Sequence, residues 1–199
     1  TREKSGSSPA VSGIKGQAAT HRIELILAHE PQSIQAESFR SIRTTLMLSL
    51  MDSNRKAFLF SSPLSQDGKS SVISNLGLAL AQAHKKVVIV DSDLRKPRQD
   101  KIFELDFNWG LSHFLSSIVD ATEVILPTPY ANLFLVPAGN AQIPPLEALL
   151  SDKMKAFITF LKQQYDFVLL DSPPLLAISD ALVLSKMVDK LILVVRAGQ

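Results

Sequence analysis

Short apolar runs, each separated from the next by a helical segment, constrain the fold of this chain more than any other feature. The runs are apolar at successive positions, so both faces of each predicted strand are expected to be buried. Strands buried on both faces and alternating with helices are typical of a parallel sheet covered on both sides. We therefore predict a three-layer α/β/α fold with a mainly parallel sheet, with strands at residues 57–60, 87–90, 133–136, 167–170 and 191–195 and helices at 34–50, 70–83 and 154–164.

Length and composition limit the classes of protein to consider. A chain of 199 residues, 46% hydrophobic and 20% charged, is expected to form a single soluble domain. Residues 1–20 are rich in Ser, Gly, Ala and Lys and predict a flexible linker or tail, which leaves residues 21–199 as the folded domain. A net charge of +2 argues against bulk nucleic-acid binding, and the absence of cysteine excludes a thiolate nucleophile.

A loop with the sequence Gly-Lys-Ser joins the first predicted strand to the following helix. Backbone N–H groups at a helix N-terminus attract phosphate, and Gly68 permits a close approach of the ligand. Lys69 is placed to reach the β- and γ-phosphates, and the Ser70 hydroxyl to bind magnesium. Because Pro63 replaces the first glycine of the usual pattern, an ordinary turn remains an equal alternative for the loop alone. The predicted nucleotide-binding residues are Ser65, Gln66, Asp67, Gly68, Lys69, Ser70 and Ser71.

Aspartates follow two of the predicted strands directly. Asp91 and Asp93 end the strand at 87–90, and Asp171 ends the strand at 167–170. Ligands of parallel α/β sheets bind at the carboxyl ends of strands, where the phosphate loop is also expected. One carboxylate is suited to magnesium and another to accepting a proton from an incoming hydroxyl. The alternative is that these aspartates cap the next element, or that Asp91 and Asp93 pair with Arg95.

Considered together, the loop and the acidic strand ends predict a P-loop NTPase-like site for ATP and Mg²⁺. Ser70, Asp91 and Asp171 are the predicted metal ligands. With these motifs in place, the chain resembles the bacterial tyrosine kinases from about residue 23 to its last residue. Residues 62–70, 87–97 and 165–174 resemble the two Walker A elements and the Walker B element of that family, and residues 37–43 its Glu-x-x-Arg-x-x-Arg motif.

The resemblance implies a specific function. It implies an ATP-dependent protein-tyrosine autokinase that regulates exopolysaccharide or capsule synthesis and export, with Lys69, Asp91 and Asp93 as catalytic residues. Of the two aspartates, Asp91 is the favoured base toward the tyrosine hydroxyl, and Asp93 supports it. The resemblance also implies a homo-oligomeric ring formed through Glu37, Arg40 and Arg43, in which a neighbouring subunit presents a tyrosine-rich tail. A membrane co-polymerase segment, in cis or in trans, would hold the domain at the cytoplasmic face of the bacterial inner membrane, and no nucleic acid is expected as a partner.

Two departures from the family pattern bear on these expectations. The family usually ends in a tyrosine-rich tail, whereas this sequence has only Tyr130 and Tyr165. The sequence also stops soon after an apolar strand, where the family continues with a further helix and strand. These departures predict a domain that is C-terminally incomplete.

Two other functions remain as alternatives. A switch ATPase of the partition or septum-positioning type shares the unusual loop but needs a lysine where this chain has Leu64. A module that binds ATP and assembles without phosphorylating would fit the scarcity of tyrosine.

Overall fold

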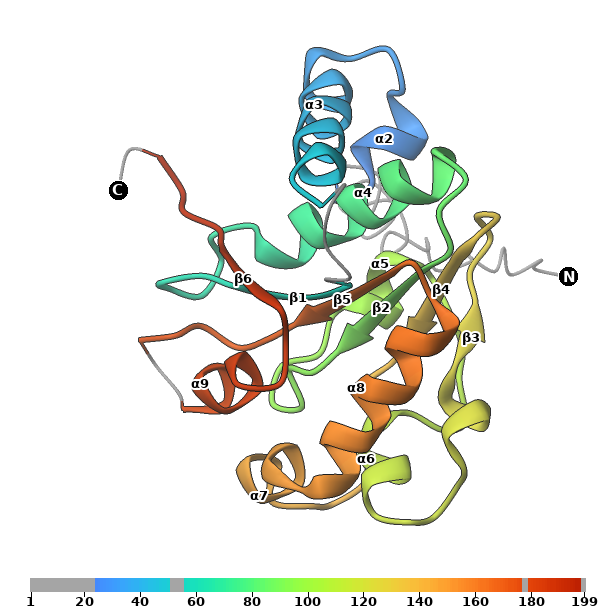
Figure 1. Ribbon diagram of the computed structural model, residues 1–199, viewed down its shortest axis with the longest axis vertical. Coiled ribbons are helices and arrows are strands. Elements are labelled where there is room, and N and C mark those ends of the chain that lie inside the picture. Colours follow the sequence, from blue (N-terminus) through green and yellow to red (C-terminus); the bar gives the residue numbers. More distant parts are fainter. Residues whose placement is uncertain (1–23, 51–55, 177–178, 198–199) are drawn as a thin grey trace, which may run out of the picture.

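The computed structural model describes residues 24–50, 56–176 and 179–197 and contains a twisted six-stranded sheet in its centre (Figure 1). The strand order is β3-β4-β2-β5-β1-β6, and all neighbouring pairs are parallel except β3 and β4. The prediction of an α/β fold with a mainly parallel sheet is therefore confirmed. The strands are β1 (Ala57–Ser61), β2 (Val87–Asp91), β3 (Leu126–Pro127), β4 (Leu133–Val136), β5 (Phe167–Asp171) and β6 (Lys190–Leu193).

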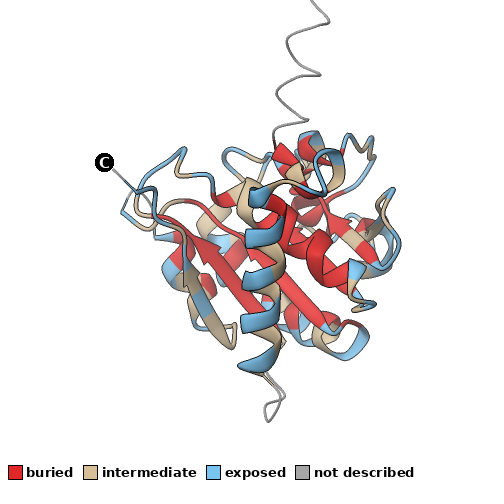
Figure 2. Ribbon diagram, turned by 90° about the horizontal axis from the view of Figure 1, so that it is seen from above, coloured by how far each residue is buried: buried red, intermediate tan, exposed pale blue. Residues whose placement is uncertain are grey.

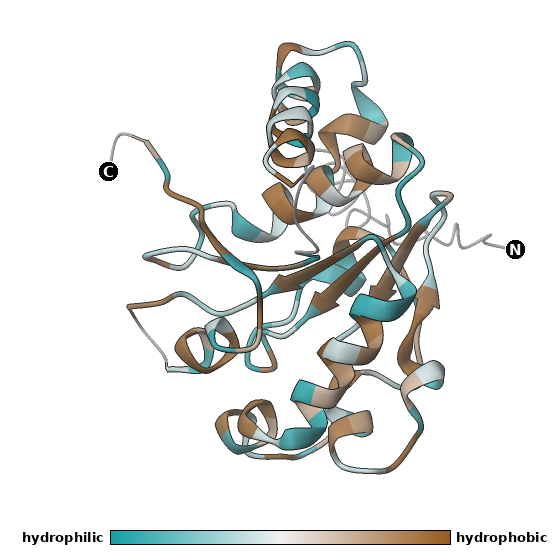
Figure 3. Cartoon of the chain, viewed as in Figure 1, coloured by the Kyte–Doolittle hydropathy of each residue, from teal (hydrophilic) through white to brown (hydrophobic). Residues whose placement is uncertain are grey.

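Helices cover the sheet on both faces and complete the three layers (Figure 1). On one face α4 (Lys69–Gln82) packs against the sheet, and α2 (Ile26–His29), α3 (Ile34–Leu48) and α5 (Gln99–Ile102) pack against α4. The other is covered by α6 (Leu111–Leu115), the 3-10 turn η1 (Ala121–Val124), α7 (Pro145–Leu150), α8 (Asp152–Gln164) and α9 (Asp180–Ser185). Strands β1, β2 and β5 are buried throughout, as the apolar runs predict (Figures 2 and 3).

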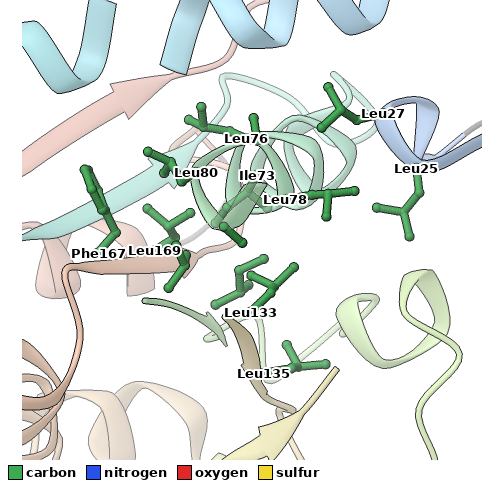
Figure 4. Packing of buried hydrophobic residues seen from close by; sticks show 14 of the residues in the cluster. Leu25, Leu27, Ile73, Leu76, Leu78, Leu80, Leu133, Leu135, Phe167 and Leu169 are labelled. Atoms are coloured by element: carbon green, nitrogen blue, oxygen red, sulfur yellow. The ribbon is translucent and has the colours of Figure 1, made fainter. Parts of the chain in front are cut away.

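Alternate residues of each strand enter different cores, because successive side chains of a strand point to opposite faces. Phe58 and Phe60 of β1 pack beneath α4, whereas Leu59 between them packs on the side of α8. Figure 4 shows the first core, in which leucines of α4 meet Leu133 and Leu169 from the sheet. The two cores fix the sheet between rigid layers, so its carboxyl edge is a stable platform for side chains.

The predicted helix at 34–50 corresponds to α3 and begins where the sequence indicates. Ser33 caps it, since its Oγ accepts the N–H of Ala36 at 3.1 Å. The last predicted strand is shorter than expected and ends at Leu193. The linker predicted at 1–20 lies outside the described residues, and across those residues no helix is both long and apolar enough to span a bilayer.

A buried amide attaches the first described segment to α4. Asn75 is completely buried; its Nδ2 donates to the carbonyl oxygen of Glu24 at 2.6 Å, and its Oδ1 accepts the N–H of Leu27 at 2.9 Å. One side chain of α4 thus forms both a donor and an acceptor bond with the chain around α2.

Candidate functional site

The strand order gathers the predicted site residues at the carboxyl edge of the sheet. Strand β5 lies between β1 and β2, so Asp171 is beside both the loop that leaves β1 and the segment that leaves β2. Asp91 and Asp171 are register partners on β2 and β5. Motifs far apart in sequence therefore meet along three adjacent strands.

The loop from Ser62 to Gly68 turns directly into α4, whose first residue is Lys69. Gly68 has φ +87°, in the left-handed region, and a Cβ at this position would meet nothing within 4 Å. The loop is braced internally, because Asp67 Oδ2 accepts the N–H of Leu64 at 3.0 Å and Ser62 Oγ donates to the Leu64 carbonyl at 2.7 Å. The start of α4 consequently presents its free N–H groups at an open, glycine-lined surface, as anion binding requires.

Lys69 forms a buried ion pair with Asp171. Lys69 Nζ contacts Asp171 Oδ1, and the two side chains are only 9% and 2% exposed. Lys69 Nζ also lies 3.5 Å from Ser70 Oγ. Lys69 therefore contacts both the Ser70 hydroxyl at the start of α4 and the Asp171 carboxylate at the end of β5.

Asp91 is almost completely buried and is bonded mainly to backbone. Its Oδ2 accepts the N–H groups of Arg98 and Gln99 at 2.9 and 3.0 Å, and its Oδ1 accepts the N–H of Asp93 at 3.2 Å. Burial, and then the nearby charge of Asp171, raise the pKa of Asp91 to about 8, although its backbone hydrogen bonds oppose that rise. The alternative interpretation, that Asp91 caps the next element, therefore agrees with the structure, because its carboxylate accepts two backbone N–H groups at the start of α5.

Asp93 is closer to solvent than Asp91. Its Oδ1 accepts the N–H groups of Arg95 and Lys96 at 3.3 and 3.0 Å, and the residue lines a cavity. The Arg95 guanidinium pairs with neither Asp91 nor Asp93. It instead contacts Asp180 of α9, with Nε 2.9 Å from Oδ2.

A cavity of about 570 Å³ opens over the loop and the start of α4. Six of the seven predicted nucleotide-binding residues line it, and Asp67 does not because its side chain is turned inward to brace the loop. Asp91 and Asp171 lie beneath the cavity rather than on its surface. The complete lining is Glu24, Ser62, Ser65, Gln66, Gly68, Lys69, Ser70, Ser71, Asp93, Lys96, Arg98, Pro174 and Arg196.

Several of these lining residues are not predicted from the sequence. Glu24 and Arg98 form an ion pair at the rim, and Arg196 reaches the cavity from the segment after β6. Lys96 and Arg98 belong to the basic stretch after Asp93. A cluster of positive charge beside an expected phosphate site is the sequence pattern that could have identified them. No local pattern connects Glu24 or Arg196 with the loop.

The donor set fits a magnesium ion bound together with phosphate. The Ser70 hydroxyl and the carboxylates of Asp91 and Asp171 are all oxygen ligands, which Mg²⁺ prefers. Burial and then the charge of Asp171 raise the pKa of Asp91, and a bound cation would relieve the repulsion between the two carboxylates. Among the described residues, no group of three His, Cys, Asp or Glu side chains is arranged to hold a metal ion by itself.

Of the predicted interface residues on α3, Glu37 is exposed, whereas Arg40 and Arg43 are partly buried. Arg40 pairs with Glu37 at 3.0 Å, and its second amino group donates to the carbonyl of Pro31 at 2.6 Å. Arg43 lines a different cavity, close to the opposite ends of the strands, with Phe167. The helix therefore lies apart from the aspartates of the site.

Comparison with known sequences places the chain among related proteins. A family model described as an AAA domain matches residues 67–199. The tyrosine-protein kinase YwqD of Bacillus subtilis is 31% identical over 185 residues, which cover 93% of this chain and 78% of that protein. The chain belongs to the bacterial tyrosine kinase family. Tyrosine-protein kinase wzc of Salmonella typhi is 30% identical over 187 residues, but the chain spans only 26% of its length.

Solved structures agree with this membership. The kinase domain of Escherichia coli tyrosine kinase ETK matches with a TM-score of 0.84 and 29% identity, over 87% of this chain and 68% of that one. The septum site-determining protein MinD of Pyrococcus horikoshii, complexed with Mg-ADP, is more distant, with a TM-score of 0.63 and 26% identity over 70% of this chain and 57% of that one. The predicted family and P-loop NTPase-like fold are therefore both confirmed.

Proposed function

We propose that this chain is an ATP-dependent protein-tyrosine kinase and that the cavity over α4 holds ATP with Mg²⁺. The single observation that carries the proposal is that Lys69 and Ser70 line the cavity together with the loop, while Lys69 contacts Asp171 beneath it. In this geometry the helix N-terminus and Lys69 neutralise phosphate charge. Bound magnesium would supply further charge neutralisation, with Ser70, Asp91 and Asp171 as the residues that hold it.

The two aspartates after β2 have different parts in this proposal. Asp93 lines the cavity and Asp91 does not, so in this proposal Asp93, rather than the Asp91 favoured from the sequence, is the carboxylate that an incoming hydroxyl would meet. Asp91 acts from below through the backbone that it holds, and its raised pKa reflects its burial and the neighbouring Asp171. Both remain catalytic residues of the proposal, and positioning together with charge neutralisation is most of what phosphoryl transfer requires.

The acceptor tyrosine lies outside these 199 residues in our proposal. Tyr165 is 7% exposed and packs edge-on against Phe134. Tyr130 is half-buried against Phe103, and burial raises the pKa of both phenols. A tyrosine-rich tail of a neighbouring subunit is therefore the proposed substrate, with Glu37, Arg40 and Arg43 of α3 forming the ring interface.

Membrane association and a role in polysaccharide export follow from the family rather than from the site. We propose that the domain works at the cytoplasmic face of the inner membrane with a co-polymerase segment, in cis or in trans. One similar solved structure is the chimerical protein CapA2B2, which matches with a TM-score of 0.81 and 33% identity, over 86% of this chain and 75% of that one.

A switch ATPase is the less favoured alternative. Such an enzyme needs a lysine early in the loop, and Leu64, which is 54% exposed, occupies that position. The packing of both tyrosines supports a non-phosphorylating assembly module. Such a module would bind ATP as the kinase does but would not transfer phosphate to tyrosine.

The proposal is tested by incubating the protein with Mg-ATP and a tyrosine-rich peptide and then probing for phosphotyrosine. We expect phosphotyrosine with the wild type and a loss of at least about a hundredfold for Lys69→Met and Asp91→Ala, since one positioned charge donor or one positioned acid–base carboxylate contributes about that much. Lys155→Met, an exposed change on α8, is the matched control. ATP binding without phosphotyrosine in the wild type would leave the assembly module as the function.

A further inference from the structure

Gln99 is a polar side chain with no solvent exposure, and it lies under the proposed site at the start of α5. Its Nε2 donates to Asp171 Oδ2 at 2.7 Å and to the Ser70 carbonyl at 3.3 Å. Its Oε1 accepts the hydroxyl of Ser74 at 2.7 Å. Every polar atom of the amide is therefore engaged with residues of α4 or β5.

The chemistry of these partners fixes the orientation of the amide. A carboxylate only accepts hydrogen bonds, so the group facing Asp171 has to be the NH₂. The Ser74 hydroxyl lies 2.7 Å from the amide oxygen and 2.7 Å from the Ser70 carbonyl oxygen, so its one proton is shared between these two acceptors. Rotating the amide would set two acceptors against each other in a dry interior, where an unsatisfied group costs about 1–3 kcal/mol.

Gln99 and Lys69 divide the two oxygens of Asp171 between them. Lys69 contacts Oδ1, whereas Gln99 occupies Oδ2. With Oδ2 held from below, the carboxylate cannot rotate freely, and Oδ1 stays directed at the position of Lys69 and Ser70. When Lys69 turns to a phosphate, the oxygen that it leaves is the one available to a metal ion.

Asp91 holds Gln99 in turn, because its Oδ2 accepts the Gln99 N–H at 3.0 Å. A continuous path of contacts therefore runs from β2 through α5 to β5. This path gives Asp91 a second effect on the site, through the backbone of Gln99.

We infer that Gln99 is a positioning residue that orients the Asp171 carboxylate toward magnesium. The inference rests on the proposed function and goes beyond it by assigning a role to a residue outside the cavity lining. Partners that orient a metal ligand from behind typically change metal affinity by about 10–100-fold when they are removed. A residue that merely filled space would change stability and leave metal affinity unaltered.

The test measures ADP affinity by titration calorimetry over a series of Mg²⁺ concentrations, together with phosphotyrosine formation. Gln99→Met keeps the shape of the side chain and removes both hydrogen-bonding ends. We expect its magnesium-free ADP affinity to stay within about threefold of wild type, since Gln99 does not line the cavity. We expect the magnesium-dependent gain in affinity to fall by at least about tenfold, and kcat to fall with it.

Two further variants complete the test. Ser74→Ala releases the amide oxygen but leaves the bond to Asp171, so it is the matched control and should retain most of the magnesium effect. Gln99→Asn keeps an amide and withdraws it by one methylene, which gives an intermediate loss if Gln99→Met proves too unstable to purify. An unchanged magnesium dependence in the Gln99 variants would overturn the inference. If the wild type forms no phosphotyrosine, the kinase proposal fails, whereas the calorimetric arm still decides the role of Gln99.

Discussion

The ion pair between Arg95 and Asp180 joins the segment after β2 to α9, and its two members differ in burial. Asp180 is 1% exposed at its side chain, whereas the Arg95 side chain is 40% exposed. Removing one partner of a buried pair costs about 3–5 kcal/mol when the other charge is left without compensation. The cost should therefore depend on which partner is removed.

For Arg95→Met we expect a loss of about 2–3 kcal/mol, below the full range because water can follow into the half-open site. For Asp180→Asn we expect about 1 kcal/mol, since the exposed guanidinium can turn to solvent and the amide can still accept a hydrogen bond. The double variant should resemble Asp180→Asn more than the sum of both, with a coupling energy of about 1–2 kcal/mol.

Urea denaturation of the nucleotide-free protein, followed by circular dichroism and by the fluorescence of Trp109, measures these differences. Trp109 is the only tryptophan in the sequence. The midpoint of thermal unfolding should fall by about 4–12 °C for Arg95→Met, from the 2–4 °C per kcal/mol typical of this size. A smaller loss for Arg95→Met than for Asp180→Asn would refute the reasoning from unequal burial.

Three other perturbations have outcomes fixed by the structure. Gly110→Ala should cost about 2–3 kcal/mol, because a Cβ would lie 2.5 Å from a backbone carbonyl oxygen of the loop after β4. Gly77→Ala should stay within about 1 kcal/mol, because its Cβ would meet side chains and no backbone, and the nearest atom, at 2.8 Å, is the flexible end of Ile89; calorimetric unfolding compares the two variants. Burial and the charge of Asp171 raise the pKa of Asp91 to about 8, so the native protein retains a proton that the unfolded chain releases near 3.8. The free energy of unfolding should therefore decrease from pH 5 to 8 by up to about 1.4 kcal/mol per unit, and Asp91→Asn should flatten this slope in urea titrations; a slope that survives the substitution would exclude Asp91 as its source. Burial acts to raise the pKa of Asp189, but two backbone N–H groups and a lysine of α8 outweigh it and lower that pKa. The stability from these contacts is therefore lost as the pH falls through the lowered pKa, so Asp189→Asn should cost about 1–2 kcal/mol at pH 7 and progressively less in acid; a loss that does not shrink as the pH falls would contradict this.

The parts of the fold that the sequence predicts are those whose signal is local. Strands β1, β2 and β5 appear as apolar runs because both of their faces are buried, and each leads into a loop or an acid that marks its carboxyl end. The meeting of Lys69 with Asp171 follows once the sheet is assumed to be parallel.

Other elements have no such signal. Helices α5, α6, α7 and α9 are four to six residues long, too short for a 3.6-residue period to be recognised. Strand β3 has two residues and is antiparallel to β4. Tertiary packing, rather than local sequence preference, produces these elements.

The contacts that refine the site are also invisible in the sequence. Gln99 and Asp171 are 72 positions apart, and a glutamine at the start of a helix has no pattern that indicates a carboxylate partner. Arg95 and Asp180 are 85 positions apart, and the nearer Asp93 is the partner that the sequence suggests for Arg95. The position of Asp91 at the end of a strand predicts it as a site residue, whereas its burial beneath the cavity is known only from the fold.

The bonds of Asn75 have a mechanical consequence. The chain around Glu24 cannot be pulled away from α4 without leaving the buried amide and two backbone groups unsatisfied, at a cost of about 1–3 kcal/mol for each. Tension applied through the chain that precedes Glu24 is therefore delivered to α4, the helix whose first residues form the floor of the cavity. Force on that chain and a ligand in the cavity would therefore both act on α4.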